Sequence, residues 1–110
     1  MQLSDIGVAL AAVIPNTSRY SAIKKDDQYL VWAEDGQAAA LFADGKMVNQ
    51  ALTGTVDYFT RTPDDPKVKG IQRALNGLSL SWRLESVQYE EETRYIHHEW
   101  VWEVESEWLV

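Results

Sequence analysis

Hydrophobic spacing predicts two amphipathic helices in this chain. In the first, over about residues 4–14, apolar side chains recur every three or four positions, and Pro15-Asn16 follows as a stop signal. Either Ser4 or Asp5 can cap its start. The second is predicted over residues 64–76, where two aspartates favour a helix start and Asn76-Gly77 favours its end.

Short apolar and β-branched runs between Gly, Asp and Asn clusters predict strands in the rest of the chain. The expected strands are residues 28–34, 38–42, 53–62, 78–90 and 93–105, of which 38–42 could also be helical. Asp35-Gly36 is expected to be a turn between the first two, and the last two are expected to form an antiparallel hairpin. The polar segment 15–28 is expected to be a loop.

These elements predict an α+β fold with the order α-β-β-β-α-β-β. An antiparallel or mixed sheet of about four to five strands would have the two helices packed on it. A length of 110 residues suits one domain, so residues 1–110 are interpreted as a single unit.

The sequence YEEETRYIHHEWVWEVE, residues 89–105, contains the most regular alternation in the chain. Side chains of a strand alternate between its two faces. The even positions here are mostly apolar and include Trp100 and Trp102, whereas the odd ones include Glu99, Glu103 and Glu105. We therefore expect a sheet with one buried face and one acidic face. Arg83, on the preceding strand, is expected to face a glutamate across the hairpin.

The two adjacent histidines, His97 and His98, do not predict a metal site. They point to opposite faces of a strand, and a catalytic zinc site needs three protein ligands. His98 is expected to be half-buried with its hydrogen bonds satisfied, and His97 to lie at the surface. The glutamates are not accompanied by a sign of a cleft, and phosphate-binding loops and nucleophile elbows are absent from the sequence. We expect no catalytic residues, no metal, no cofactor and no enzymatic activity.

Charge is distributed unevenly along the chain. The net charge is −7, and residues 85–110 contain eight glutamates and one arginine, while residues 1–84 are balanced. This pattern disfavours binding to the DNA backbone, which needs clustered basic residues. It suits a basic protein partner, a channel that repels DNA, or a mimic of DNA charge. The longest apolar run is too short to span a bilayer, so no membrane association is expected. The chain has no cysteine, so no disulfide is expected.

Several stretches together are similar to one protein family. They are YLVWAEDGQ, ADGKMVNQALTGTVDYFTRTPDDPKVKGIQRAL and SVQYEEETRYIHHEWVWEVE, within residues 28–105. This run resembles the small tail-completion proteins of long-tailed bacteriophages and prophages, the tail terminator and tail-to-head joining class. The resemblance implies a compact α+β domain that forms a ring, usually hexameric, at the head-proximal end of the tail tube.

The resemblance also implies partners and a location. The partners would be other copies of the chain, the tail tube protein and the head connector or neck proteins. The protein would be found in the tail or neck of the virion, after assembly in the host cytoplasm. It would bind no membrane and no specific nucleic-acid sequence, and DNA would pass through a channel whose acidic lining repels it.

Two groups of residues are candidates for the contact between copies or with a partner. The segment 15–28 contains the one basic cluster, Arg19, Tyr20, Lys24 and Lys25, which is predicted to meet the acidic face of a neighbouring copy. Trp108 and Leu109 depart from the strand alternation, so they are predicted to be exposed at an interface rather than in the core.

Two other functions remain open from the sequence. One is a different neck or head-completion protein of the same assembly. The other is an acidic inhibitor, immunity-type protein or DNA mimic that binds a basic partner through its C-terminal glutamates. A ring-forming protein needs two complementary surfaces on each copy, whereas an inhibitor needs one.

Overall fold

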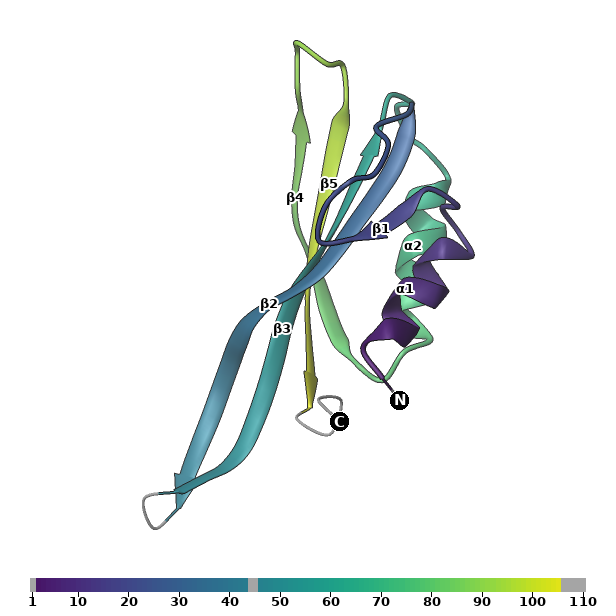
Figure 1. Cartoon of the computed structure of the whole chain (residues 1–110). Coiled ribbons are helices and arrows are strands. Elements are labelled where there is room, and N and C mark those ends of the chain that lie inside the picture. The colour runs from purple at the N-terminus through teal and green to yellow at the C-terminus, as the bar shows by residue number, and fades with distance from the viewer. Residues whose placement is uncertain (1, 44–45, 106–110) are drawn as a thin grey trace.

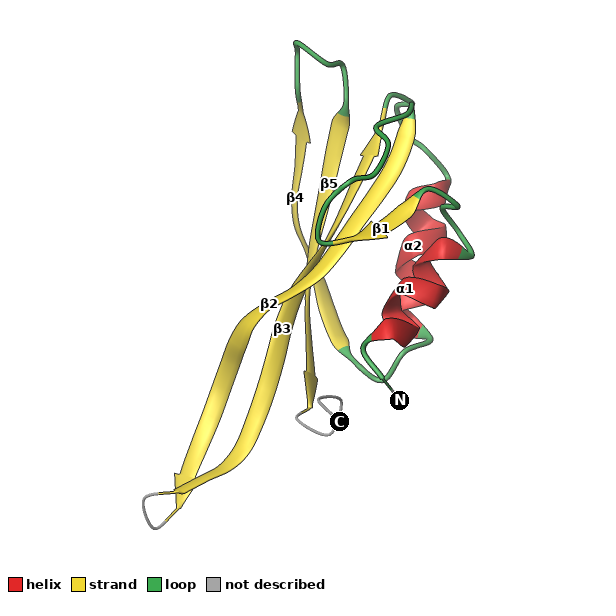
Figure 2. Cartoon of the chain, in the orientation of Figure 1, coloured by secondary structure: helices red, strands yellow, loops and turns green. Residues whose placement is uncertain are grey.

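The protein folds as a mixed sheet with two helices on one face (Figures 1 and 2). The structure, a computed structural model, describes residues 2–43 and 46–105. Its elements are α1 (Ser4–Ala11), β1 (Thr17–Arg19), β2 (Gln28–Ala43), β3 (Lys46–Thr60), α2 (Lys67–Asn76), β4 (Ser81–Tyr89) and β5 (Ile96–Glu105). The sheet has five strands in the order β1-β2-β3-β5-β4. The predicted fold class and the predicted element order are both confirmed.

Two details of the strand prediction were wrong. Asp35-Gly36 is not a turn, because β2 continues through it and pairs with β3 on both sides of a register shift between Glu34 and Gly36. The segment expected to be a loop contains β1, which pairs in parallel with β2. Strand β1 is only three residues long, too short for sequence alternation to reveal, and its pairing depends on contacts distant in sequence.

The core lies between the helices and the sheet. Its fully or nearly fully buried side chains are Ile6, Leu10, Ile14, Leu30, Trp32, Val56, Tyr58, Ile71, Leu75, Trp100, Trp102 and Val104. The alternation predicted for the last strand is confirmed, because Trp100, Trp102 and Val104 are buried while Glu103 and Glu105 are exposed. Burial of each tryptophan contributes on the order of 3 kcal/mol to folding.

Both helices are shorter than predicted at one end. Helix α1 ends at Ala11 rather than at residue 14. It starts after Leu3 without a side-chain cap, although the Asp5 carboxylate accepts a hydrogen bond from the Gln2 backbone N–H at 2.8 Å. Helix α2 begins at Lys67 rather than at residue 64, and the Asp65 carboxylate accepts a hydrogen bond from the Lys67 backbone N–H at 2.9 Å. Asp65 therefore precedes the helix and caps its first turn.

The β2–β3 hairpin extends far beyond the rest of the sheet (Figure 1). Within the described residues, β1 pairs with β2 as far as Trp32, and β5 pairs with β3 from Thr60 back to Ala51. Strands β2 and β3 continue to pair with each other out to Ala43 and Lys46. We call this two-stranded extension, residues 37–43 and 46–50, the arm. It contributes to an elongated molecule of 52 × 25 × 23 Å.

Candidate assembly surfaces

The exposed large hydrophobic side chains of the described residues are Leu84, Val87 and Tyr89 on β4, Val8 on α1, and Tyr20 and Ile23 after β1. We call the three on β4 the β4 patch. Strands β1 and β4 are the two outermost strands, and α1 packs beside β1. Exposed apolar groups at two separate edges suit a protein that contacts neighbours on both sides.

The β4 patch was not predicted from the sequence. A register shift between Leu84 and Ser86 inserts an extra residue into β4. After this bulge, odd-numbered side chains point to the face that even-numbered ones occupied before it. Val87 thus pairs opposite His98 and joins Leu84 on the helix-side face. The sequence does contain a signal for this bulge, because the apolar residues of this stretch change from even positions up to Leu84 to odd positions from Val87.

The predicted basic cluster divides into internal and exposed groups. The Arg19 guanidinium pairs with the Glu34 carboxylate at 2.6 Å and stacks over the Trp32 ring at 4.6 Å. The Tyr20 hydroxyl donates a hydrogen bond to the same carboxylate. Arg19 is therefore engaged within the fold, whereas Lys24, whose side chain is 75% exposed, and Lys25 lie at the surface.

Residues 20–27 are fixed against the end of the sheet rather than free in solvent. The Tyr95 hydroxyl donates a hydrogen bond to the Asp26 carbonyl at 2.6 Å. Arg61 pairs with Asp27 at 2.7 Å and stacks on the Tyr95 ring at 4.2 Å. The Asn16 side-chain amide also donates to the Lys24 carbonyl at 2.9 Å. These contacts hold the exposed Lys24 side chain at a defined place on the surface.

The face of the sheet opposite the helices is acidic along β5, and residues 20–27 cover the part of it that holds the buried Tyr29 and Tyr95. Glu99 lies opposite Asp57 in the strand register, and Glu103 and Glu105 are exposed further along β5. Arg83 does not face a glutamate as predicted, because the β4 register places it opposite Val101. It pairs at 2.6 Å with Glu85 of its own strand. Trp108 and Leu109 lie outside the described residues, so their predicted interface role stays a prediction.

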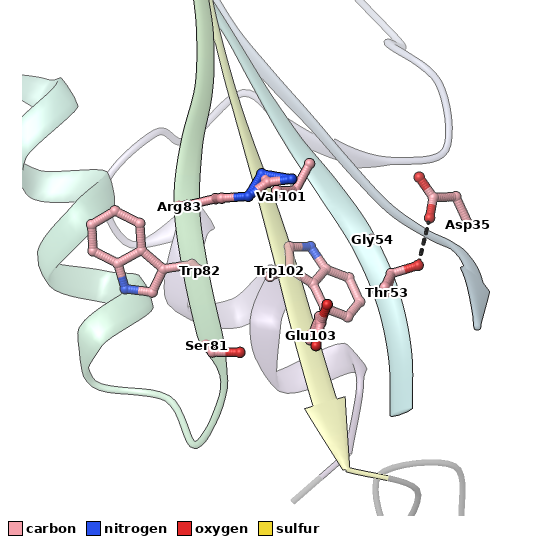
Figure 3. A pocket seen from close by; sticks show the side chains of 9 residues that line it. All are labelled: Asp35, Thr53, Gly54, Ser81, Trp82, Arg83, Val101, Trp102 and Glu103. Carbon is pink, nitrogen blue, oxygen red and sulfur yellow. Dashed lines mark hydrogen bonds between the residues drawn. The ribbon is translucent and has the colours of Figure 1, made fainter. Parts of the chain in front are cut away.

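A shallow cavity of about 410 Å³ lies at the root of the arm (Figure 3). Its walls include Asp35, Thr53, Arg83, Trp102 and Glu103. The Thr53 hydroxyl donates a hydrogen bond to the Asp35 carboxylate at 3.1 Å. Across residues 2–43 and 46–105, His, Cys, Asp and Glu side chains form no group of three or more that could hold a metal ion.

Both histidines are half-buried, so the half-burial predicted for His98 is confirmed and the surface position predicted for His97 is wrong. His97 is half-buried, shares a 2.6 Å hydrogen bond with Asp57 and stacks on the Phe59 ring at 4.2 Å. His98 is the one left unsatisfied, because within the described residues its Nδ1 atom is buried without a hydrogen-bond partner. Alternation assigned each histidine to the correct face, but the neighbours on that face come from other strands.

The two histidines should make the stability depend on pH in opposite directions. The hydrogen bond that the His97 ring donates to the Asp57 carboxylate raises the pKa of His97 above 6.5, and burial opposes it only partly. Its stabilisation is present below about pH 6.5 and is lost as the pH rises through the folded-state pKa. Burial lowers the pKa of His98 below 6.5, so its environment destabilises the fold as the pH falls below that value.

We expect His97→Gln to remove a loss of stability that the native protein shows on going from about pH 6 to about pH 8. The variant His98→Gln should change the dependence of stability on pH in the opposite sense, because it removes a loss of stability that the native protein shows as the pH falls. Thermal melting across this pH range measures both slopes. Identical pH profiles for the native protein and His97→Gln would contradict the role of the Asp57 pair.

Comparison with known proteins gives a structural match without a sequence match. No protein-family model matches the chain, and no curated protein sequence does. None of the described helices is both long and apolar enough to cross a membrane. A chain in a solved structure of the virion of a native gene transfer agent particle has a similar fold, with a TM-score of 0.57 and 9% identity. The alignment covers 87% of this chain and 82% of that chain, so the two share a fold over most of their length.

Proposed function

We propose that this protein is a structural component of a phage-type virion, a tail terminator or head-tail joining protein that forms a ring at the head-proximal end of the tail tube. The observation that carries the proposal is the arm, which has no third strand beside it within the described residues. The shared fold with a chain of a gene transfer agent virion and the sequence resemblance to tail-completion proteins support it.

The arm is the part of the molecule that a single copy leaves incomplete. A two-stranded hairpin is marginally stable at best in water, and within the described residues no further strand pairs with the outer edges of the arm. A neighbouring copy, or the tail tube protein, can cover one edge or one face of the arm and order it. Such contacts reach beyond the body of the subunit, which suits a protein that links copies into a ring.

The acidic part of the face opposite the helices, along β5, can line the channel of such a ring. If it faces the channel, Glu99, Glu103 and Glu105 give the channel a negative lining, and DNA in transit is repelled rather than bound. The proposed role involves no catalysis, metal or cofactor. The partners in this role are other copies of the chain, the tail tube protein and the head connector or neck proteins, within the virion.

A shortened arm tests the proposal. Gln37 and Leu52 pair across the hairpin, so replacing residues 38–51 with Asn-Gly closes it with a favoured two-residue turn. We expect the melting temperature to change little, because the core lies elsewhere, and the ring to be lost. Native mass spectrometry over a wide concentration range measures the assembly state, with the full chain as reference.

The result would distinguish the proposed ring from the other functions. A closed oligomer of the full chain that becomes monomeric in the shortened-arm variant supports the ring. A full chain that stays monomeric at every concentration contradicts spontaneous ring formation. In that case an acidic inhibitor or DNA mimic, which needs one binding surface, becomes the better interpretation.

A further inference from the structure

The end of α2 carries a chemically labile pair of residues, Asn76 and Gly77, and both are exposed. The chain has three asparagines, and Asn76 is the one that precedes a glycine. Asparagine is among the thermolabile residues, and it is most labile before glycine, where no side chain hinders attack by the next backbone nitrogen on the carboxamide. This junction therefore has the sequence and the access to water that deamidation requires.

The fold keeps the Gly77 nitrogen out of this reaction. Its N–H donates hydrogen bonds to the backbone carbonyls of Arg73 at 3.1 Å and Ala74 at 3.2 Å. To attack, this nitrogen must lose its proton and come nearly into line with the Asn76 Cβ atom, so that a five-membered ring can close. Asn76 is the last residue of α2, and a helical ψ of about −40° holds the next nitrogen away from that alignment. The closed end of the helix therefore opposes deamidation.

A second contact fixes the carboxamide of Asn76 itself. The Trp82 indole N–H donates a 2.8 Å hydrogen bond to the Asn76 Oδ1 atom. Figure 3 shows the Trp82 ring pointing from β4 toward the side of the helices. This ring packs against the core, so the hydrogen bond ties the end of α2 to a well-held group of the sheet. Unwinding of the last turn of α2 would break both this bond and the two bonds from Gly77.

We propose that Asn76 is a site of spontaneous deamidation, which the closed end of α2 protects and the opening of that end exposes. In the open state the Gly77 nitrogen forms a bond to the Asn76 Cγ atom, and the bond from Cγ to Nδ2 breaks. The side-chain nitrogen leaves as ammonia with the proton from Gly77, and a succinimide remains. Water then adds to one of the two ring carbonyls and opens the ring, which gives aspartate or isoaspartate.

The isoaspartate product does not fit the connection between α2 and β4. In isoaspartate the main chain runs through the former side-chain carbons, so the connection becomes longer by a methylene group. Leu75, directly before the site, is fully buried, and the Leu78 N–H donates to the Leu75 carbonyl at 3.1 Å. A longer main chain disrupts this turn and the packing of Leu78 on the core. A copy that opens at this point is therefore changed permanently and re-forms the end of α2 less well.

Incubation of the full chain in mildly alkaline buffer, with and without guanidinium chloride, tests the proposal. Mass spectrometry of digested samples measures conversion at Asn76, with Asn16 as an internal reference. We expect conversion at Asn76 to be at least about tenfold slower in the folded chain than in the unfolded chain, because opening of the helix end limits it. Gly77→Ala is the matched control. A methyl group there meets the Ala74 oxygen at 3.5 Å, an ordinary contact, so this variant should fold and should convert slowly in both conditions.

The outcomes test the site and its protection separately. Equal conversion rates in the folded and the unfolded chain would overturn the protection by α2. Conversion at Asn76 that is no faster than at Asn16 in the unfolded chain would overturn the site itself. The isoaspartate fraction, separated by chromatography, should melt at a lower temperature than the variant Asn76→Asp, which has the native main chain and an oxygen acceptor for the Trp82 N–H. Equal melting temperatures would overturn the inferred damage to the junction.

Discussion

Replacing Asp65 with alanine is expected to lower the free energy of unfolding by about 3–5 kcal/mol. Asp65 is 6% exposed and is one of the few polar side chains buried in the described structure. One carboxylate oxygen accepts hydrogen bonds from the Tyr58 hydroxyl at 2.6 Å and the Thr60 hydroxyl at 2.8 Å. The other accepts the Lys67 backbone N–H at the start of α2.

The loss is large because several groups lose a partner at once. Alanine would leave the buried Tyr58 and Thr60 hydroxyls without their acceptor, and α2 without its N-terminal cap. Denaturant unfolding measures the change, and Asp64→Asn is the matched control. Asp64 is exposed and has φ of 54°, a conformation that asparagine also adopts, so this variant removes a charge without a buried contact. A change in the free energy of unfolding under about 1 kcal/mol for Asp65→Ala would contradict this role of Asp65 as a shared hydrogen-bond acceptor.

The same carboxylate should contribute to acid denaturation. Burial raises the pKa of Asp65, but the hydrogen bonds from Tyr58, the Lys67 N–H and Thr60 outweigh it, so the pKa lies below its usual value. A depressed pKa means that the stabilisation is present above the unfolded-state pKa of about 4 and is lost as the pH falls through the folded-state value. The native protein should therefore lose more stability in acid than Asp65→Ala does.

Asp65 also shows where prediction from sequence reached its limit. Its position before an amphipathic segment indicated a helix start, and the structure has it cap α2. The sequence contained no sign that Tyr58 and Thr60, on the preceding strand, would converge on the same carboxylate. Periodicity identifies the face on which a side chain lies, whereas its partners depend on strand register and helix placement.

The candidate surfaces show the same division. Alternation located the acidic face, and composition located the exposed lysines Lys24 and Lys25. Arg19 belongs to the same basic cluster, but Glu34, fifteen residues away in sequence, engages it within the fold. The β4 patch depends on a one-residue bulge that changes the phase of the strand, and an interpretation based on strict alternation misses it.

Replacing Gly54 with alanine is the second change with a large expected effect, about 3 kcal/mol of destabilisation. Gly54 lies in β3 directly opposite Trp102 in β5, and the indole ring of Trp102 covers it. A methyl group at this position would meet the Trp102 ring and the Ala33 carbonyl oxygen at separations under 3.0 Å. Trp102 is 1% exposed, and the Ala33 oxygen belongs to the paired backbone of β2, so neither can shift cheaply.

Gly36→Ala provides the matched control for this prediction. Gly36 also lies in the β2–β3 hairpin, but a methyl group there would find its nearest neighbour, the Thr53 hydroxyl, at 3.5 Å, an ordinary contact. We expect Gly36→Ala to leave the free energy of unfolding within about 0.5 kcal/mol of the native value or to raise it slightly. Equal stabilities for the two variants would show that the sheet can move apart at Trp102. A selective loss in Gly54→Ala would establish that a glycine inside the strand is required for the tryptophan to pack across it, as expected where a side chain approaches the backbone closely.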